Sequence, residues 1–337
     1  MATLWTDVID PATLTGYMRE SLAAYEARQG SLEQWLGNET VPDIHVSFDV
    51  GAFGLTQTAR FRAFDAEPEY TKEEAGKRVM IELPAIGQKI AISEYRALRQ
   101  RNASDQAMLD SILKSADRVV RGVADRIELL RGVVLETGKA TVNQTNFKID
   151  DDFGRPAGHT VVAGAFWSIA GTDRLADLLA WQDVYRATNS VNPGTMLMSS
   201  TVYSQFRKGT QFINEITGRP MTQGSINEIL VDEGLPPITI FDRRVNFEGT
   251  LTSVISPKKV LFLPAAADSE QLGRTYWGTT LTATDLGWGI ADDEQAGIVA
   301  GVYRNEQPPV IAEVISDAIG MPVLGNAALS FSAQVLA

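Results

Sequence analysis

The stretch from Gly132 to Thr141, GVVLETGKAT, carries a Gly-Lys pair of the kind found in phosphate-binding loops. Such a loop has the spacing G-x-x-x-x-G-K-[ST], in which backbone N–H groups surround the phosphates, the lysine reaches them and the last hydroxyl holds Mg²⁺. Here the spacing fails twice, because Val133 stands where the first glycine is needed and Ala140 directly follows Lys139. We therefore interpret Gly138 as the end of a helix.

The candidates for acid–base or metal chemistry are few. The chain has no cysteine, which excludes disulfides, thiolate metal sites and cysteine nucleophiles, and its only histidines are His45 and His159. Neither lies in a His-x-x-x-His pair, and the chain has no G-x-S-x-G elbow, so we interpret both as structural. Three acidic clusters lack the spacing of a calcium loop and are interpreted as solvated turns: Asp150–Asp152, Asp292–Glu294 and Glu73–Glu74. We predict no catalytic residue, metal or cofactor.

The composition argues against two kinds of partner. The chain has 337 residues, of which 44% are hydrophobic and 21% charged, as in globular proteins, and a formal net charge of -12. Tight wrapping of nucleic acid needs an excess of lysine and arginine, so this charge argues against it. No signal peptide or membrane-spanning run is found. Several aromatic residues lack interleaved basic residues and are expected in the core or at subunit contacts: Trp167, Trp181, Tyr185, Trp277 and Trp288.

The elements that would position these residues begin with two segments that cannot close a core alone. Residues 1–40 carry short helical patches such as Leu14 to Tyr25, separated at Asp10-Pro11, and predict an extended arm that packs on something else. Strand-like residues at 58–64 and 78–83 flank a charged tip, which predicts a long β-hairpin. We expect both segments to need partners outside their own domain.

The strongest periodic signal lies between Ser104 and Gly138. Apolar residues recur there at spacings of three and four, from Met108 to Val134, which predicts one helix of about thirty residues, roughly 50 Å long. Strand-like residues at 141–143 and 147–149 predict a hairpin after it. A helix therefore precedes the Gly-Lys pair and strands follow it, which is the reverse of a phosphate loop.

The second half of the chain alternates between helices and strands without βαβ regularity, which favours the α+β class. Expected helices cover 173–187 and 201–208, and a third starts at the capping box Ser225–Glu228 and ends at Gly234. Expected strands cover 195–198, 238–242, 260–263, 276–284, 298–303, 310–315 and 329–335.

This order of elements resembles the major capsid proteins of tailed bacteriophages, and within them the lambda-type E family of head proteins. The residues that carry the resemblance are the extended loop with its return, the long helix that runs into a strand, the strand and short helix MLMSSTVY, the strand PKKVLFLP, and the chain end: 60–89, 105–142, 195–203, 257–264 and 329–337.

The resemblance implies a tailed-phage capsid fold of the Hong Kong type. It implies an N-terminal arm, an extended loop, a peripheral domain that contains the spine helix, an α/β axial domain, and C-terminal strands that return to the core of both domains: 1–40, 41–95, 96–160, 161–300 and 301–337. It also implies a structural protein rather than an enzyme, which forms hexamers and pentamers in the icosahedral shell of a virion, is assembled in the bacterial cytoplasm and encloses double-stranded DNA.

The expected intersubunit contacts lie in the loop and the arm: Arg60, Phe61, Arg62, Phe64, Glu73, Glu74, Lys77, Arg78, Trp5 and Trp35. Further expected partners are a separate scaffolding protein, because no fused scaffold segment is found, and a portal. A decoration protein stays open, and DNA is expected only by non-specific proximity. Two alternatives remain: an encapsulin-like cargo shell, and an enzyme for a small anionic substrate at Gly138-Lys139 and Arg243-Arg244.

Overall fold

The computed structural model describes residues 2–50, 77–95, 105–144, 147–213, 218–305 and 307–337. The helical patch expected at Leu14 to Tyr25 is confirmed by α1 (Pro11–Gln29). The expectation that the N-terminal segment is an extended arm needs correction, because α1 packs within its own chain. Asp10 caps it by accepting a hydrogen bond from the Thr13 N–H, and Pro11 takes the first helical position. The Asp-Pro pair that we interpreted as a separator therefore marks the start of this helix.

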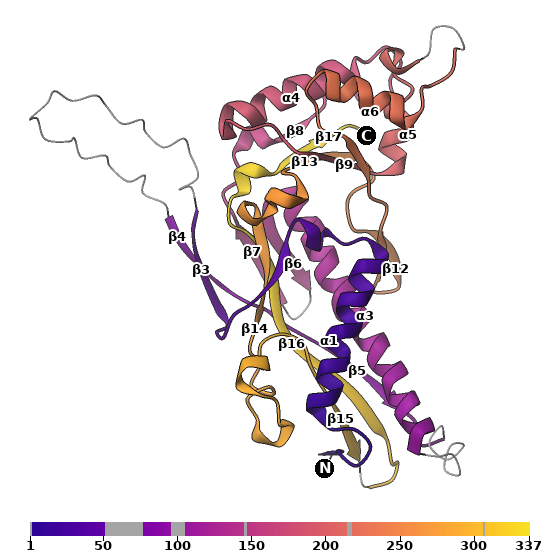
Figure 1. The fold of residues 1–337 in the computed structure, drawn as a ribbon, viewed down its shortest axis with the longest axis vertical. Helices are drawn as coiled ribbons and strands as arrows, with labels where there is room; N and C mark the ends of the chain where they lie inside the picture. The colour runs from indigo at the N-terminus through magenta and orange to yellow at the C-terminus, as the bar shows by residue number, and fades with distance from the viewer. Residues whose placement is uncertain (1, 51–76, 96–104, 145–146, 214–217, 306) are drawn as a thin grey trace, which may run out of the picture.

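The long helix is present as predicted. It is α3 (Asp105–Thr137), which has 33 residues, and Gly138 follows it with a φ of +71°. One face of α3 is buried against α1 and against the larger sheet, through residues such as Ile112, Val119 and Val123. The helix therefore connects the two ends of the molecule, as Figure 1 shows.

A six-stranded sheet lies against α1 and α3. Its central strand is β16 (Ala312–Leu324). The N-terminal part of β16 pairs with β15 (Val299–Asn305) and β5 (Ala85–Ile92), and its C-terminal part pairs with β14 (Gly273–Gly278). β1 (Ala2–Leu4) and β2 (Gly37–Thr40) complete the edges. The strand expected at 310–315 thus continues to Leu324, while the one expected at 276–284 starts earlier and ends at Gly278.

Three two-stranded hairpins extend from this body. β3 (His45–Val50) pairs with β4 (Lys77–Glu82), β6 (Lys139–Gln144) with β7 (Phe147–Asp152), and β11 (Arg244–Phe247) with β12 (Thr250–Ser253). The hairpin after α3 is therefore confirmed. The strand paired with β4 is His45–Val50 instead of the expected Thr58–Phe64, which lies outside the described residues.

A five-stranded sheet with its helices forms the other end of the molecule (Figure 1). The strand order is β10 (Ile238–Ile240), β9 (Thr195–Met198), β13 (Lys259–Leu263), β17 (Phe331–Gln334) and β8 (Thr160–Val162). The helices are α4 (Arg174–Asn189), α5 (Ser200–Phe206) and α6 (Gln223–Asp232). The capping box expected at Ser225 is wrong, because Thr222 caps α6 and Ser225 lies in its first turn.

The main hydrophobic core runs from this sheet down to the base of β3–β4. Trp167, Trp181 and Tyr185 are buried in it, and Trp181 packs on Phe331 with ring centres 6.3 Å apart. Trp277 and Trp288 are buried in two smaller clusters on the six-stranded sheet. β14 and the first two residues of β15 lie within residues 161–300, yet both strands belong to the six-stranded sheet and not to the five-stranded one.

Candidate functional site

The Gly-Lys pair at the end of α3 is a helix terminus. The Gly138 N–H donates to the Val134 carbonyl over 2.8 Å, and the positive φ of Gly138 turns the chain into β6. Lys139 pairs instead with Asp152 across the β6–β7 hairpin, with Nζ 2.8 Å from Oδ2 at a largely exposed position. Gly132 also has a packing role, because a Cβ atom there would overlap the Val254 carbonyl.

Sequence analysis missed Arg155, which completes the end of α3. Its guanidinium donates to the carbonyl oxygens of Leu135 and Glu136 and to the Ser330 hydroxyl. Positive charge at this position is favourable because the last carbonyls of a helix carry partial negative charge. Burial lowers the pKa of Arg155 to about 10. An arginine that follows a hairpin gives no local signal for this role.

The two histidines differ in their surroundings. His159 is fully buried, with its Nδ1 3.3 Å from the Ser330 carbonyl oxygen and its Nε2 3.1 Å from the Thr188 hydroxyl. Its ring lies between Tyr185 and Phe331, and burial lowers its pKa. These contacts confirm the structural interpretation of His159. His45 is exposed on β3.

Arg243, one residue of the expected anion site, has its partners within the chain. Its guanidinium lies 3.1 Å from Asp125, 3.5 Å from Glu128 and over the Tyr25 ring, and its side chain is 5% exposed. Lys139 is likewise paired with Asp152. Neither cation is therefore available to bind a substrate anion without losing an existing ion pair.

Glu128 also belongs to a buried polar cluster around Arg131, whose side chain is fully buried. The Arg131 guanidinium donates to five side chains from five parts of the chain: Glu26, Ser31, Asn38, Glu128 and Thr275. Charged hydrogen bonds of this kind satisfy a cation that burial would otherwise destabilise. The cluster joins α1 and β2 to α3.

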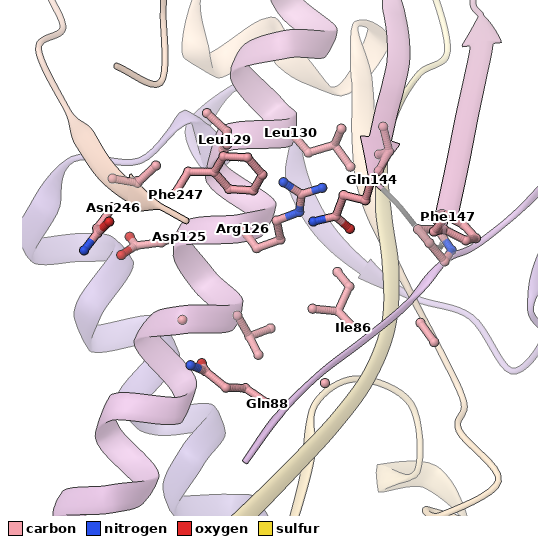
Figure 2. A pocket seen from close by; sticks show the side chains of 17 residues that line it. Ile86, Gln88, Asp125, Arg126, Leu129, Leu130, Gln144, Phe147, Asn246 and Phe247 are labelled. Carbon is pink, nitrogen blue, oxygen red and sulfur yellow. The ribbon is translucent and has the colours of Figure 1, made fainter. Parts of the chain in front are cut away.

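A pocket of about 430 Å³ lies between α3, the start of β5 and the hairpins β6–β7 and β11–β12. Figure 2 shows Ile86, Leu129 and Phe247 around it, with the side chains of Arg126 and Gln144 close to each other. The Arg126 guanidinium lies over the Phe247 ring, 4.9 Å from its centre, and burial lowers its pKa. The lining is mixed apolar and polar and holds no nucleophile paired with a base.

Two of the three acidic clusters lie within the described residues. Asp150–Asp152 lie on β7, Asp292–Glu294 form a short turn, and Glu73-Glu74 lie outside the described residues. Across the described ranges, no group of three or more His, Cys, Asp or Glu side chains is arranged to hold a metal ion. In the same residues, no helix has the length and apolar character to cross a membrane.

The expected interface residues lie in different environments. Lys77 and Arg78 begin β4, while six others are outside the described residues: Arg60, Phe61, Arg62, Phe64, Glu73 and Glu74. Trp5 is half-buried under the Arg304 guanidinium. Trp35 is 2% exposed, and its Nε1 donates to the Pro264 carbonyl. In this conformation Trp35 therefore has its partners in its own chain and is not available to a neighbour.

Comparisons with known proteins identify the architecture. A candidate prophage capsid protein of Escherichia coli CFT073 aligns over 99% of both chains, with 12% identity and a TM-score of 0.68. A phage-related protein of Bordetella bronchiseptica RB50 aligns over 96% of this chain and 97% of its own, with 14% identity and a TM-score of 0.59. The capsid of a native GTA particle aligns over 91% of this chain and 90% of its own, with 14% identity and a TM-score of 0.51. At these identities the similarity shows the fold alone.

The sequence comparisons give the family. No match is found among curated protein sequences. The model of the family described as phage major capsid protein E matches residues 30–295, which is more than half of the chain. That range covers α3, the β3–β4 hairpin and most of the five-stranded sheet, and the mixed α and β fold agrees with it. The chain therefore belongs to the phage major capsid protein E family, whose members form the shell of the phage head.

Proposed function

We propose that copies of this chain assemble into hexamers and pentamers of an icosahedral head, with the β3–β4 hairpin lying over a neighbouring subunit, while the rest of the expected loop segment 41–95 includes β5, which stays paired with β16 of its own chain. The β3–β4 hairpin carries this proposal. Within the described residues β3 and β4 pair only with each other, and they extend from one side of the body (Figure 1). A two-stranded hairpin is marginal by itself in water, so a partner subunit would stabilise it.

The side chains of the hairpin are divided between the core and the surface. Val46, Ile81 and Leu83 are buried in the main core and anchor the base. Met80 is 70% exposed and Ile44 is 37% exposed, although both are large apolar residues. Exposed apolar residues on a projecting element are typical of interaction surfaces. Lys77 and Arg78, at the start of β4, would add charged contacts.

The arrangement of the two sheets supports the Hong Kong-type division of the fold. We assign α3, with the six-stranded sheet, to the peripheral domain, so that α3 is the spine helix, and the five-stranded sheet with α4, α5 and α6 to the axial domain. Since β14 and β15 belong to the six-stranded sheet, the peripheral domain would include them. The N-terminal segment then packs along the spine helix, with Trp5 as its most N-terminal expected contact.

The remaining partners are proposed from the resemblance to tailed-phage head proteins. They are a scaffolding protein and a portal, with a decoration protein left open, during assembly in a bacterial cytoplasm. The formal net charge of -12 supports DNA that is enclosed without being gripped. An encapsulin-like cargo shell would share the architecture, but the match to a phage capsid family favours the phage head.

Electron microscopy of the purified protein, alone and with its scaffold, tests the proposed function. We expect closed shells built of hexamers and pentamers. Persistent monomers under both conditions, with residues 77–89 already protected from proteolysis, would contradict it. Enclosed DNA and a neighbouring portal gene would separate a phage head from a cargo shell, whose particles would hold protein.

A further inference from the structure

The chain leaves the six-stranded sheet between β14 and β15 and forms a compact excursion that ends in an apolar tip. Leu281 is 90% exposed and Leu286 is 97% exposed, the two highest values among the large exposed apolar residues in the described ranges. Leu281 lies in a turn, and Leu286, five positions later, begins the short 3-10 helix η5 (Leu286–Trp288). Single exposed leucines are normal on protein surfaces, but two on one short structured excursion indicate a contact.

The turn is held rigidly from within. On one side of Leu286, the Asp285 carboxylate accepts a hydrogen bond from the Gly287 N–H over 2.8 Å. On its other side, Trp288 is buried. The Thr282 hydroxyl donates to Asp317 on β16 over 2.7 Å, which ties the turn to the sheet. Ala283 and Trp288 are buried, while the two leucines are exposed.

The neck of the excursion is fixed as well. Thr279 and Ala296 form an isolated β-bridge, and Arg19 on α1 donates to the carbonyl oxygens of Glu294, Ala296 and Ile298. Because the backbone is already ordered, little conformational entropy would be lost when the leucines are buried by a partner. The turn is therefore preorganised for binding.

The direction of the turn indicates what that partner is. In Figure 1 the orange excursion lies on the same side of the molecule as the β3–β4 hairpin, while α1 and α3 lie on the other side. In a closed ring, each subunit contacts the next one head to tail, through two different surfaces. The β3–β4 hairpin and the excursion lie on the same side of the subunit, so both would contact the same neighbour. We propose that Leu281 and Leu286 anchor a second subunit contact, with the copy of this chain that also receives the β3–β4 loop. This inference rests on the proposed function.

The absence of cysteine allows a direct test by thiol labelling. In a Leu286→Cys variant the new thiol should react readily with a maleimide in the unassembled subunit. In assembled particles we expect the rate of maleimide labelling to fall at least about tenfold. A tenfold change corresponds to one order of magnitude in affinity. Dissociating the same particles should restore the rate. Equal rates in particles and free subunits would overturn the contact.

A variant series gives an independent readout of assembly. The double variant Leu281→Ser/Leu286→Ser should need at least about tenfold more protein to form particles, with an unchanged circular dichroism spectrum. Leu251→Ser is the matched control, because Leu251 is 66% exposed on β12, in another hairpin. Unchanged assembly of the double variant would overturn the contact, as would an equal defect in Leu251→Ser. Wild-type protein that never forms particles would overturn the proposed function itself.

Discussion

The buried side of α3 and the β3–β4 hairpin differ in where their side chains find partners. Arg131 is fully buried and bonds to side chains of α1, β2, β14, α3 and the loop before β2. On β4, in contrast, Met80 is 70% exposed, and β4 pairs with β3 alone within the described residues. The first region is complete in one chain, whereas we propose that the second is completed by other copies.

This difference separates two requirements of a shell subunit. Residues with all partners inside the chain should determine the free energy of unfolding and leave the geometry of assembly unchanged. Residues on the projecting side should affect assembly and leave the fold intact. The predictions below test whether the two sets of residues separate in this way.

The largest effect is expected at Arg131. An Arg131→Met change would leave Glu26 and Glu128 buried without their cation, and should lower the free energy of unfolding by about 3–5 kcal/mol. Urea denaturation of the unassembled subunit measures this. A loss below about 1 kcal/mol would show that the cluster does not hold α1 on α3.

A smaller loss is expected at Gly138. Its φ of +71° disfavours any side chain, and a Cβ atom would lie 2.8 Å from the Cβ of Arg155. Gly138→Ala should therefore cost about 1–3 kcal/mol of unfolding free energy, partly by displacing the Arg155 cap. An Arg155→Met variant in the same urea series should show a smaller loss when combined with Gly138→Ala than when made alone. If the losses of unfolding free energy from the two variants add, Gly138 and Arg155 stabilise the protein independently of each other.

The pH dependence of stability should depend on His159. Burial lowers its pKa below the ordinary value of 6.5, so the unfolded chain takes up a proton first as the pH falls. Stability should thus be complete above about pH 6.5 and decrease below it, by at most about 1.4 kcal/mol per pH unit.

Denaturation at pH 7.5 and pH 5.5 measures the effect of His159. The difference between the two pH values should shrink in a His159→Gln variant. His45→Gln is the matched control, because His45 is exposed and is the only other histidine. A pH dependence that is the same in wild type and His159→Gln would contradict the prediction.

The smallest effect is expected at Lys139. Its ion pair with Asp152 is largely exposed, and pairs of this kind contribute little. Lys139→Ala should leave the denaturation midpoint, the assembly and the weak or absent binding of inorganic phosphate unchanged. Loss of a measurable phosphate affinity in this variant would instead revive the enzyme hypothesis.

The sequence predicted elements whose signal is local. The three-and-four spacing of apolar residues located α3, and Gly138 located its end, because helix packing and helix termination depend on neighbouring residues. The continuation of β16 through Gly320 and Pro322 could not be predicted, since the pairing with β14 comes from residues more than forty positions away. Arg155 and the Arg131 cluster escaped for the same reason.

The projecting side was predicted only in part. The resemblance gave the extended loop, but the pairing of His45–Val50 with β4 was not predicted, although the alternation of polar and apolar residues in this stretch is visible in the sequence. Leu281 and Leu286 carried no pattern, because exposure depends on how Ala283 and Trp288 pack beneath them. Trp35 was misplaced because an aromatic residue in the arm fits a core and an interface equally well.

Hydrogen exchange of β4 in two states of the protein tests the central claim most directly. Residues 77–82 should exchange rapidly in the unassembled subunit and much more slowly in assembled particles. The buried part of α3 around Arg131 should be strongly protected in both states, since its partners are in the same chain. Equal exchange of residues 77–82 in subunits and particles would contradict the account.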